Sequence, residues 1–312
     1  MTAGVPLSEP GCKVRSGFEA RRAWPLAAAA LVGALLAFGA SRWHRKTACL
    51  RARLEAVRHC VPIARNDGDE LEGLPPPVQR YFRLALRPGQ APIAAVDLRQ
   101  AGTINLSRDG DRWKPFTAEQ RIVMHRPGFD WDARIRAFPG ATVRVHDAYV
   151  AGEGVLEASL WGLVPLAAAR GTPEAARGEL MRYLAEAAWY PTALLPSQGL
   201  RWDAVDAMSA HATLCDGDTE VTLLFTFDSA GLIEAARARS RGAAVGKTVV
   251  MTPWEGRWAN YQLRDGMRVP MEGEAAWLTP KGRRPYWRGS VIAISYDYEP
   301  VPPIASNDQD LS

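Results

Sequence analysis

Hydrophobic and polar positions alternate through most of the chain after residue 74. Between Phe129 and Phe138, hydrophobic residues at odd positions alternate with Asp and Arg at even positions. A period of two is typical of a β-strand with one buried face. Similar runs cover residues 143–149, 221–227 and 292–298, and glycine-containing turns separate many of them. The pattern predicts a mainly β (α+β) fold, with a curved antiparallel sheet or half-barrel.

A helical segment interrupts this series of strands. Thr172 is suited to be an N-cap, Pro173 fits the first helical position, and Leu180 and Leu184 share one face. We expect this helix to run to about Ala188. A curved sheet with one inserted helix can shelter a hydrophobic cavity, for which the helix would be a lid.

An uncharged segment at residues 23–41 precedes the β-rich region. Its nineteen residues would span about 28 Å as a helix, which is close to the hydrocarbon thickness of a bilayer. Trp24 and Trp43 stand at its two ends, where interfacial indoles occur in membrane proteins. We therefore expect a single transmembrane helix in a cell-membrane protein.

A cleaved signal peptide is the alternative, because Ala37-Phe38-Gly39 places small residues as at a cleavage site. The long basic leader and the basic residues after the segment favour an anchor instead. Lys and Arg are nearly balanced across the segment, with four before it and five after it. The side of the main domain is therefore undecided, with a slight lean to the cytoplasm.

These patterns divide the chain into five parts. We expect a basic leader at 1–22, a transmembrane helix at 23–43, a basic helix and linker at 44–73, a β-rich ligand-binding-like domain at 74–300, and a disordered tail at 301–312.

The composition is rich in tryptophan and poor in metal ligands. The chain has 11 Trp beside 5 His and 4 Cys, and no cysteines have C-x-x-C spacing. This argues against a His/Cys metal site and favours an aromatic-lined core or pocket, so we expect no metal and no cofactor. The net charge is +4, and much of the excess flanks the apolar segment. The charge therefore indicates a membrane flank and no nucleic-acid partner.

Two local motifs are weak evidence for a functional site. Gly242 to Thr248 is one residue short of a Walker A motif and is followed by a strand-like run, so we expect a hairpin loop. His146 and Asp147 are neighbours on a predicted strand and must face opposite sides. We interpret His146 as a surface histidine.

Three arginines, Arg237, Arg239 and Arg241, would share one strand face. We interpret this face as solvated. The alternative is that carboxylates answer the arginines in a polar cavity, and the candidates are Asp130, Asp132 and Glu186.

Several segments together resemble a family of uncharacterised bacterial proteins classed as a domain of unknown function. The resemblance spans about 74–298, and its most specific part is Arg182 to Pro196. It implies a conserved domain without an assigned activity. A weaker, fold-level similarity is to the half-barrels of bacterial lipoprotein-carrier proteins. The other matching segments are Leu74-Pro75-Pro76-Pro77-Val78-Gln79-Arg80-Tyr81, Gln100-Ala101-Gly102, Phe129 to Arg134, Pro253-Trp254-Glu255-Gly256 and Pro285-Tyr286-Trp287-Arg288-Gly289.

Our leading hypothesis is a membrane-anchored domain that binds a hydrophobic or amphiphilic ligand such as a lipid. An enzyme is the second hypothesis, with Asp132, Asp147 and Glu186 as acid/base groups and Arg134, Arg182 and Arg239 as anion binders. A structural or scaffolding role is the third. The candidate ligand-binding residues are Trp131, Arg134, Asp147, Tyr149, Arg182, Glu186, Trp189, Tyr190, Arg239, Trp254, Tyr286 and Trp287.

Overall fold

The computed structural model describes residues 1, 17–58, 69–107, 110–245 and 248–299. The expected disordered tail, most of the basic leader and much of the expected linker lie outside these ranges.

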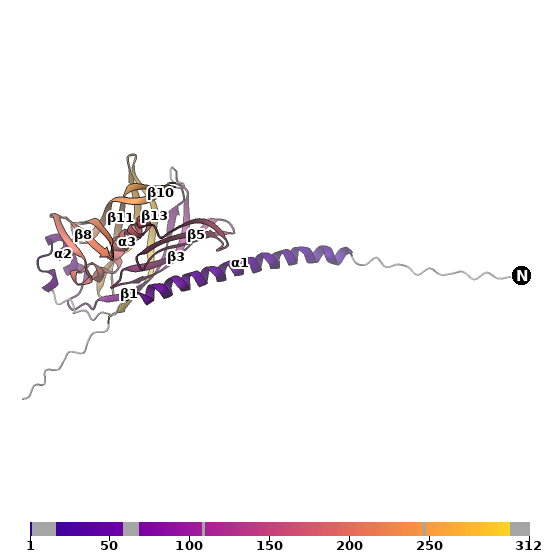
Figure 1. Ribbon diagram of the computed structural model, residues 1–312, viewed down its shortest axis with the longest axis horizontal. Coiled ribbons are helices and arrows are strands. Elements are labelled where there is room, and N and C mark those ends of the chain that lie inside the picture. Colours follow the sequence, from indigo (N-terminus) through magenta and orange to yellow (C-terminus); the bar gives the residue numbers. More distant parts are fainter. Residues whose placement is uncertain (2–16, 59–68, 108–109, 246–247, 300–312) are drawn as a thin grey trace, which may run out of the picture.

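The described residues form one 13-stranded antiparallel sheet that is strongly curved (Figure 1). The first half runs outward as a meander through β1 (Ile93–Asn105), β2 (Trp113–Val123), β3 (Gly128–Phe138), β4 (Ala141–Val150), β5 (Glu153–Leu160) and β6 (Val164–Arg170). The second half returns through β7 (Arg201–Asp206), β8 (Ser209–Asp216), β9 (Thr219–Phe227), β10 (Ile233–Val245), β11 (Thr248–Arg264), β12 (Met267–Thr279) and β13 (Gly282–Tyr298).

The two halves join where β13 pairs with β1, so that β6 and β7 are the free edges of an open sheet. The predicted curved antiparallel sheet is therefore confirmed. The near-Walker segment lies at the β10–β11 hairpin, where Val245 pairs with Thr248, and residues 246–247 lie outside the described ranges.

Helix α3 (Pro173–Glu186) lies inside the curve of the sheet. It joins β6 to β7, which are opposite edges, so the chain must cross the concave side to connect them. The Thr172 hydroxyl accepts a hydrogen bond from the Ala175 N–H at 3.2 Å and caps the helix as the sequence predicts. Three short 3-10 turns follow, at Ala187–Trp189, Pro191–Leu194 and Pro196–Gln198.

The main hydrophobic core fills the concave side around α3. Helix α2 (Pro76–Ala85) contacts β8 and β12 and adds the fully buried Tyr81 and Phe82 to this core. A short 3-10 turn, η1 (Asp69–Leu71), precedes α2. The core is therefore built from both halves of the sheet and from the two helices.

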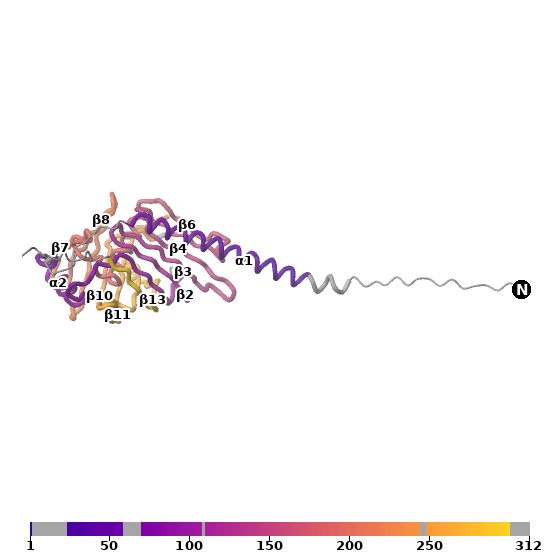
Figure 2. The backbone as a smooth tube through the Cα atoms, turned by 90° about the horizontal axis from the view of Figure 1, so that it is seen from below, coloured from indigo at the N-terminus to yellow at the C-terminus, as the bar shows by residue number. Residues whose placement is uncertain are grey.

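Helix α1 (Gly17–Ala56) is a single continuous helix with two different environments (Figure 2). Every side chain from Trp24 to Phe38 is exposed, whereas the part after Gly39 packs on the convex face of β2, β3 and β4. The helix contains an 18-residue window of mean hydropathy 1.7, which is long and apolar enough for a membrane span or a signal sequence.

The docked half of α1 corrects two predictions. Trp43 does not lie at a membrane interface: it is 1% exposed, its ring stacks on His146 at 4.2 Å, and its indole N–H donates to Asp132 Oδ1 at 2.9 Å. His146 is fully buried rather than on the surface. Strand periodicity separates the two faces of β3 and β4 correctly, but α1 covers the face that was expected to meet solvent.

The same docking buries Asp130 and Asp132, which the alternation placed on a solvated face. The Thr47 hydroxyl lies 3.0 Å from Asp132 Oδ2, and Arg51 donates to Asp130 Oδ2 at 3.2 Å. Burial raises the pKa of Asp130 to about 7, against the opposing effect of Arg51. Burial also lowers the pKa of His146 to about 4, which keeps the ring neutral near pH 7.

Part of the basic flank therefore has a structural role. Lys46 binds Glu157, Arg51 binds Asp130, and Arg53 binds Glu153. These contacts hold α1 against the sheet, so the positive charge after the apolar segment is only partly a membrane flank.

Candidate functional site

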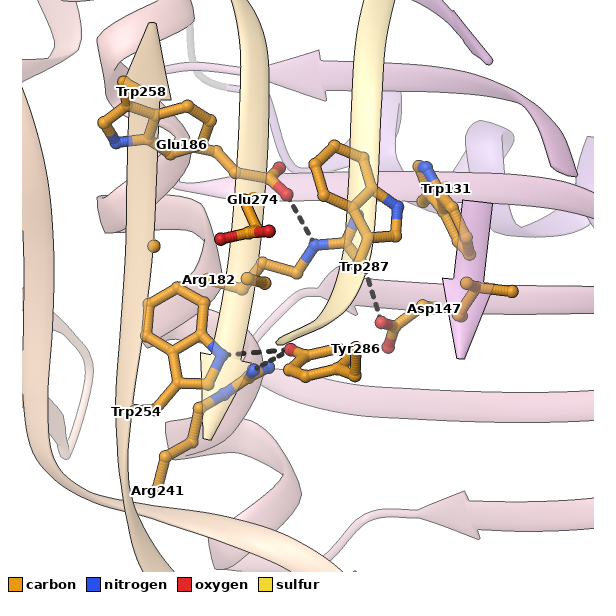
Figure 3. A pocket seen from close by; sticks show the side chains of 13 residues that line it. Trp131, Asp147, Arg182, Glu186, Arg241, Trp254, Trp258, Glu274, Tyr286 and Trp287 are labelled. Atoms are coloured by element: carbon orange, nitrogen blue, oxygen red, sulfur yellow. Dashed lines mark hydrogen bonds and ion pairs between the residues drawn. The ribbon is translucent and has the colours of Figure 1, made fainter. Parts of the chain in front are cut away.

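A pocket lies on the concave side between α3 and strands β10 to β13 (Figure 3). Its empty space is about 580 Å³ with the solvent at its mouth included, and about 100 Å³ of this is open to the centres of water molecules. Its lining consists of Ile104, Trp131, Asp147, Arg182, Glu186, Arg241, Trp254, Gly256, Trp258, Glu274, Ala275, Tyr286 and Trp287.

Arg182 on α3 is the central charge of this pocket. Its Nε donates to Glu186 Oε1 at 2.7 Å and its Nη1 donates to Asp147 Oδ2 at 2.5 Å, as Figure 3 shows. The guanidinium also lies over the rings of Phe129 and Trp131, at 4.8 and 5.1 Å from their centroids. These contacts satisfy the charge of Arg182 before any ligand is bound. Its pKa is raised above the ordinary value because the two nearby carboxylates outweigh the effect of burial.

A second polar cluster in the pocket centres on Tyr286. Its hydroxyl accepts hydrogen bonds from Trp254 Nε1 at 3.0 Å and from Arg241 Nη1 at 3.4 Å. Arg241 also donates to the Gly178 carbonyl at 3.0 Å and lies 3.5 Å from Glu179 Oε1. Burial and the neighbouring Asp147 raise the pKa of Glu179 to about 8.

Two β-bulges aim residues into this pocket. The pairing of β10 with β11 shifts between Ala238 and Arg241, so Arg241 faces the pocket while Arg237 faces away and binds Glu255. The pairing of β12 with β13 shifts at Ala275, which brings the adjacent Tyr286 and Trp287 to the same side. A bulge adds one residue and reverses the alternation beyond it.

The first bulge overturns the expectation that Arg237, Arg239 and Arg241 share one face. Arg237 binds Glu255, Arg239 is exposed, and Arg241 is buried in the pocket. The acidic side chain beside Arg241 is Glu179, not one of the three residues that the sequence suggested, and its raised pKa leaves it largely protonated near pH 7.

Indole rings lie against glycines along the pocket wall. A Cβ at Gly289 would be 2.4 Å from the Trp287 ring, and a Cβ at Gly273 would be 2.7 Å from the Trp258 ring. Only glycine leaves room for these rings to lie along the strands. The glycines therefore set the orientation of the indoles that line the pocket.

One buried polar atom of the lining is left without a partner. Trp258 Nε1 makes no hydrogen bond within the described part of the chain. Asp147, by contrast, is hydrogen-bonded to Glu179, whose raised pKa allows its carboxyl to donate. Buried polar groups are nearly always paired, so a bound molecule with an acceptor for the indole N–H would complete the pocket.

Seven of the twelve predicted ligand-binding residues line this one pocket. They come from β3, β4, α3, β11 and β13, which are far apart in the sequence, and they are Trp131, Asp147, Arg182, Glu186, Trp254, Tyr286 and Trp287.

The other five lie elsewhere. Tyr149 donates to Asp216, Trp189 donates to the Pro270 carbonyl, and Tyr190 donates to the Tyr183 carbonyl. Trp189 packs behind the pocket, with its ring 4.8 Å from that of Trp258. Arg134 and Arg239 are exposed.

The proposed acid/base set is divided by the sheet. Asp132 pairs with Trp43 and Thr47 on the convex side, whereas Asp147 and Glu186 both bind Arg182 on the concave side. Arg182 is occupied by these two carboxylates and is therefore a poor anion binder. Among the described residues, no group of three or more His, Cys, Asp or Glu side chains could hold a metal ion.

Sequence reasoning missed several lining residues, of which Arg241 and Trp258 are the most important. Trp258 follows Trp254 and Gly256 at the spacing of one strand face, and this pattern could have identified it. Arg241 had no comparable signal because a bulge determines its direction. The remaining missed residues are Ile104, Gly256, Glu274 and Ala275.

A model for a family of unknown function, DUF6920, matches residues 72–296. This confirms the resemblance seen in the sequence. No curated protein matches the chain.

Two solved structures are similar to parts of the chain. A LolA superfamily protein from Nitrosomonas europaea aligns with a TM-score of 0.36 and 9% identity, over 72% of this chain and 93% of that one. A beta-barrel-like protein of the domain of unknown function DUF1849 from Brucella abortus aligns with a TM-score of 0.20 and 12% identity, over 67% of this chain and 100% of that one. The ligand must therefore be inferred from the pocket itself.

Proposed function

We propose that the β-rich domain of this chain, which belongs to the DUF6920 family of unknown function, binds an amphiphilic ligand with an uncharged polar head. The observation on which this proposal rests is the pocket walled by indoles, with its charges balanced internally and with an unpaired indole N–H inside it.

The apolar part of the ligand is argued from the walls. Trp131, Trp254, Trp258 and Trp287 contribute four indoles, and the enclosed volume of about 100 Å³ is smaller than the about 300–1,000 Å³ of pockets that bury a whole small molecule. The narrow part has room for several water molecules at about 10–15 Å³ each. A compact head fits this part, and a longer apolar chain would extend toward the open mouth.

The uncharged head is argued from the charge balance. Arg182 and Arg241 are balanced by the two carboxylates of Asp147 and Glu186, because the raised pKa of Glu179 leaves that group largely protonated near pH 7. An anionic head would upset this balance. The oxygen of a hydroxyl or amide could instead accept a hydrogen bond from Trp258 Nε1 without disturbing any ion pair.

The projecting part of α1 is proposed to anchor the domain to a membrane. All fifteen side chains from Trp24 to Phe38 are exposed and uncharged. Flotation of the chain with lipid vesicles, together with the N-terminal sequence of the mature chain, would separate an anchor from a cleaved signal. A mature chain that begins after Gly39 would contradict the anchor.

Ligand binding is tested with two matched fluorophores on the full chain in nanodiscs, after subtraction of the signal of empty nanodiscs. N-phenyl-1-naphthylamine is uncharged and has one N–H donor, and 8-anilinonaphthalene-1-sulfonate adds an anionic group to the same rings. We expect the uncharged probe to bind about tenfold or more tightly than the sulfonate.

The matched variants are Ala275→Phe, which fills the pocket, and Ala259→Phe, which adds the same ring at an exposed position of β11. Only the first should abolish probe binding. Equal binding to both variants would show that the probe does not occupy this pocket. Native mass spectrometry of the chain extracted from its host membrane would then identify the natural ligand.

A further inference from the structure

Apolar side chains gather at the turns beside the point where α1 leaves the sheet. Phe138 ends β3 and is 61% exposed, and Val164 and Leu166 on the edge strand β6 are 50% and 54% exposed. The turn that contains Trp161 and Leu163 packs directly against α1 at Gly39. The Trp161 indole N–H donates to the Gly140 carbonyl at 2.9 Å and ties the two turns together. We call these five apolar side chains the rim.

An arginine cluster lies behind the rim on the convex face. Arg134 and Arg144 are directly opposite each other on β3 and β4, and Arg136 lies two residues closer to the turn. None of the three forms an ion pair with another described residue, and Nη1 of Arg144 is buried without a hydrogen-bond partner. Like charges directly opposite across strands are destabilising unless an anion lies between them. Burial and the charge of Arg134 lower the pKa of Arg144, which adds to the cost of leaving it unpaired.

The exposed part of α1 is short for a bilayer. Its fifteen residues from Trp24 to Phe38 span about 22 Å, whereas the hydrocarbon core is about 30 Å thick. Charged residues stand before it at Glu19, Arg21 and Arg22, and the docked half begins at Gly39. A helix of this length brings whatever lies beside Gly39 into the membrane interface. The rim lies there, and Figure 2 shows the β3–β4 side of the sheet beside the projecting helix.

We propose that the rim inserts into the interfacial layer of an anionic phospholipid bilayer, with Arg134, Arg136 and Arg144 bound to its phosphates. This inference rests on the proposed membrane anchor and is independent of the ligand pocket. The rim would lie in the interfacial layer, where apolar and indole side chains are favoured, and the arginines would lie at the depth of the anionic headgroups. The end of the sheet that carries the rim is thus fixed against the membrane, and the domain cannot swing freely about the helix.

The test uses the full chain in nanodiscs, with an environment-sensitive fluorophore on Val164→Cys and the native cysteines at 12, 49, 60 and 215 replaced by serine. Val249→Cys is the matched control because Val249 is 55% exposed, close to the 50% of Val164, but lies on the β10–β11 hairpin. Nitroxide-labelled lipids should quench the label at 164 and leave the label at 249 unquenched. Quenching at 164 should increase when phosphatidylglycerol replaces part of the phosphatidylcholine.

The arginines are tested by Arg134→Gln, Arg136→Gln and Arg144→Gln together. Each arginine near an anionic surface strengthens membrane binding about fivefold. The combined variant should therefore lower the ratio of quenched to unquenched label by about tenfold or more in anionic nanodiscs. In neutral nanodiscs the shift should be absent.

A label at 164 that stays in water while the chain floats with vesicles would overturn the proposed insertion of the rim and leave the proposed anchor intact. A chain that does not float would overturn both. Unchanged naphthylamine binding in these variants would show that the ligand pocket works independently of the contact between the rim and the membrane.

Discussion

The buried ion-pair cluster around Arg182 allows a sharp test of how the pocket is built. Replacing Arg182 by Met keeps most of the side-chain volume and removes the guanidinium. Asp147 and Glu186 then lose their cation while remaining in a site where their side chains are 18% and 11% exposed. Removing one partner of a buried ion pair costs about 3–5 kcal/mol because the other charge stays buried and uncompensated. The contacts with Phe129 and Trp131 are lost as well.

We therefore expect Arg182→Met to lower the free energy of unfolding by about 3–5 kcal/mol. The assay is chemical denaturation of the full chain in detergent, followed by tryptophan fluorescence. Adding Asp147→Asn and Glu186→Gln to the same chain should restore most of the loss, because no uncompensated charge remains. The control is Arg201→Met, since Arg201 is 67% exposed and its ion pair with Asp203 should contribute less than about 1 kcal/mol.

A cost below about 1 kcal/mol for Arg182→Met would refute this reasoning, because it would mean that water solvates the two carboxylates in the pocket. A triple variant no more stable than the single one would mean that Arg182 acts through packing and not through charge.

Three further changes test other parts of the structure. Gly289→Ala places a Cβ 2.4 Å from the Trp287 ring and should weaken naphthylamine binding about tenfold in a fluorescence titration. Gly33→Ala is the control, because Gly33 has open space around it and the change should leave binding unaffected. Asp130→Asn should gain about 4 kcal/mol of stability over the wild type between about pH 4 and about pH 7 in denaturation experiments. The reason is that the unfolded carboxyl ionises near pH 4 whereas the folded-state pKa of Asp130 is raised to about 7, so the wild-type fold loses stability as the pH rises through this range. A pH-independent difference would argue against burial. Trp43→Ala should cost about 3–5 kcal/mol of α1 docking, visible as faster hydrogen exchange in the docked half of α1 with unchanged exchange in α3.

Local pattern was enough for the elements of the fold. The period of two located β3 and β4 and separated the two faces of each strand, and the pairing of Trp131 with Asp147 shows which of these faces lie together. The Thr172 cap and the following proline located the start of α3. These features depend on neighbours in the sequence, so the sequence alone contains the information.

The outer face of the sheet could not be predicted in the same way. Alternation places Asp132 and His146 on the outer faces of their strands, but it does not state whether water or protein covers them. Helix α1 covers them, and Trp43 of this helix contacts both residues although about 90 to 100 positions separate it from them. The docked half of α1 thus covers this face of the sheet and adds Leu50 and Leu54 to a second buried hydrophobic cluster.

The sequence by itself determined several of the strands, the Thr172 cap and the apolar N-terminal segment, and it named seven residues that line the pocket. Only the tertiary structure decided which side Arg241 and Tyr286 face, because a β-bulge reverses the alternation without changing the hydrophobic pattern. It also decided that the charges of the pocket are already paired, since Arg182 on α3 and Asp147 on β4 meet only when the chain crosses the concave side of the sheet. Periodicity reports the local geometry of the backbone, whereas the partner of a buried charge depends on how distant segments pack.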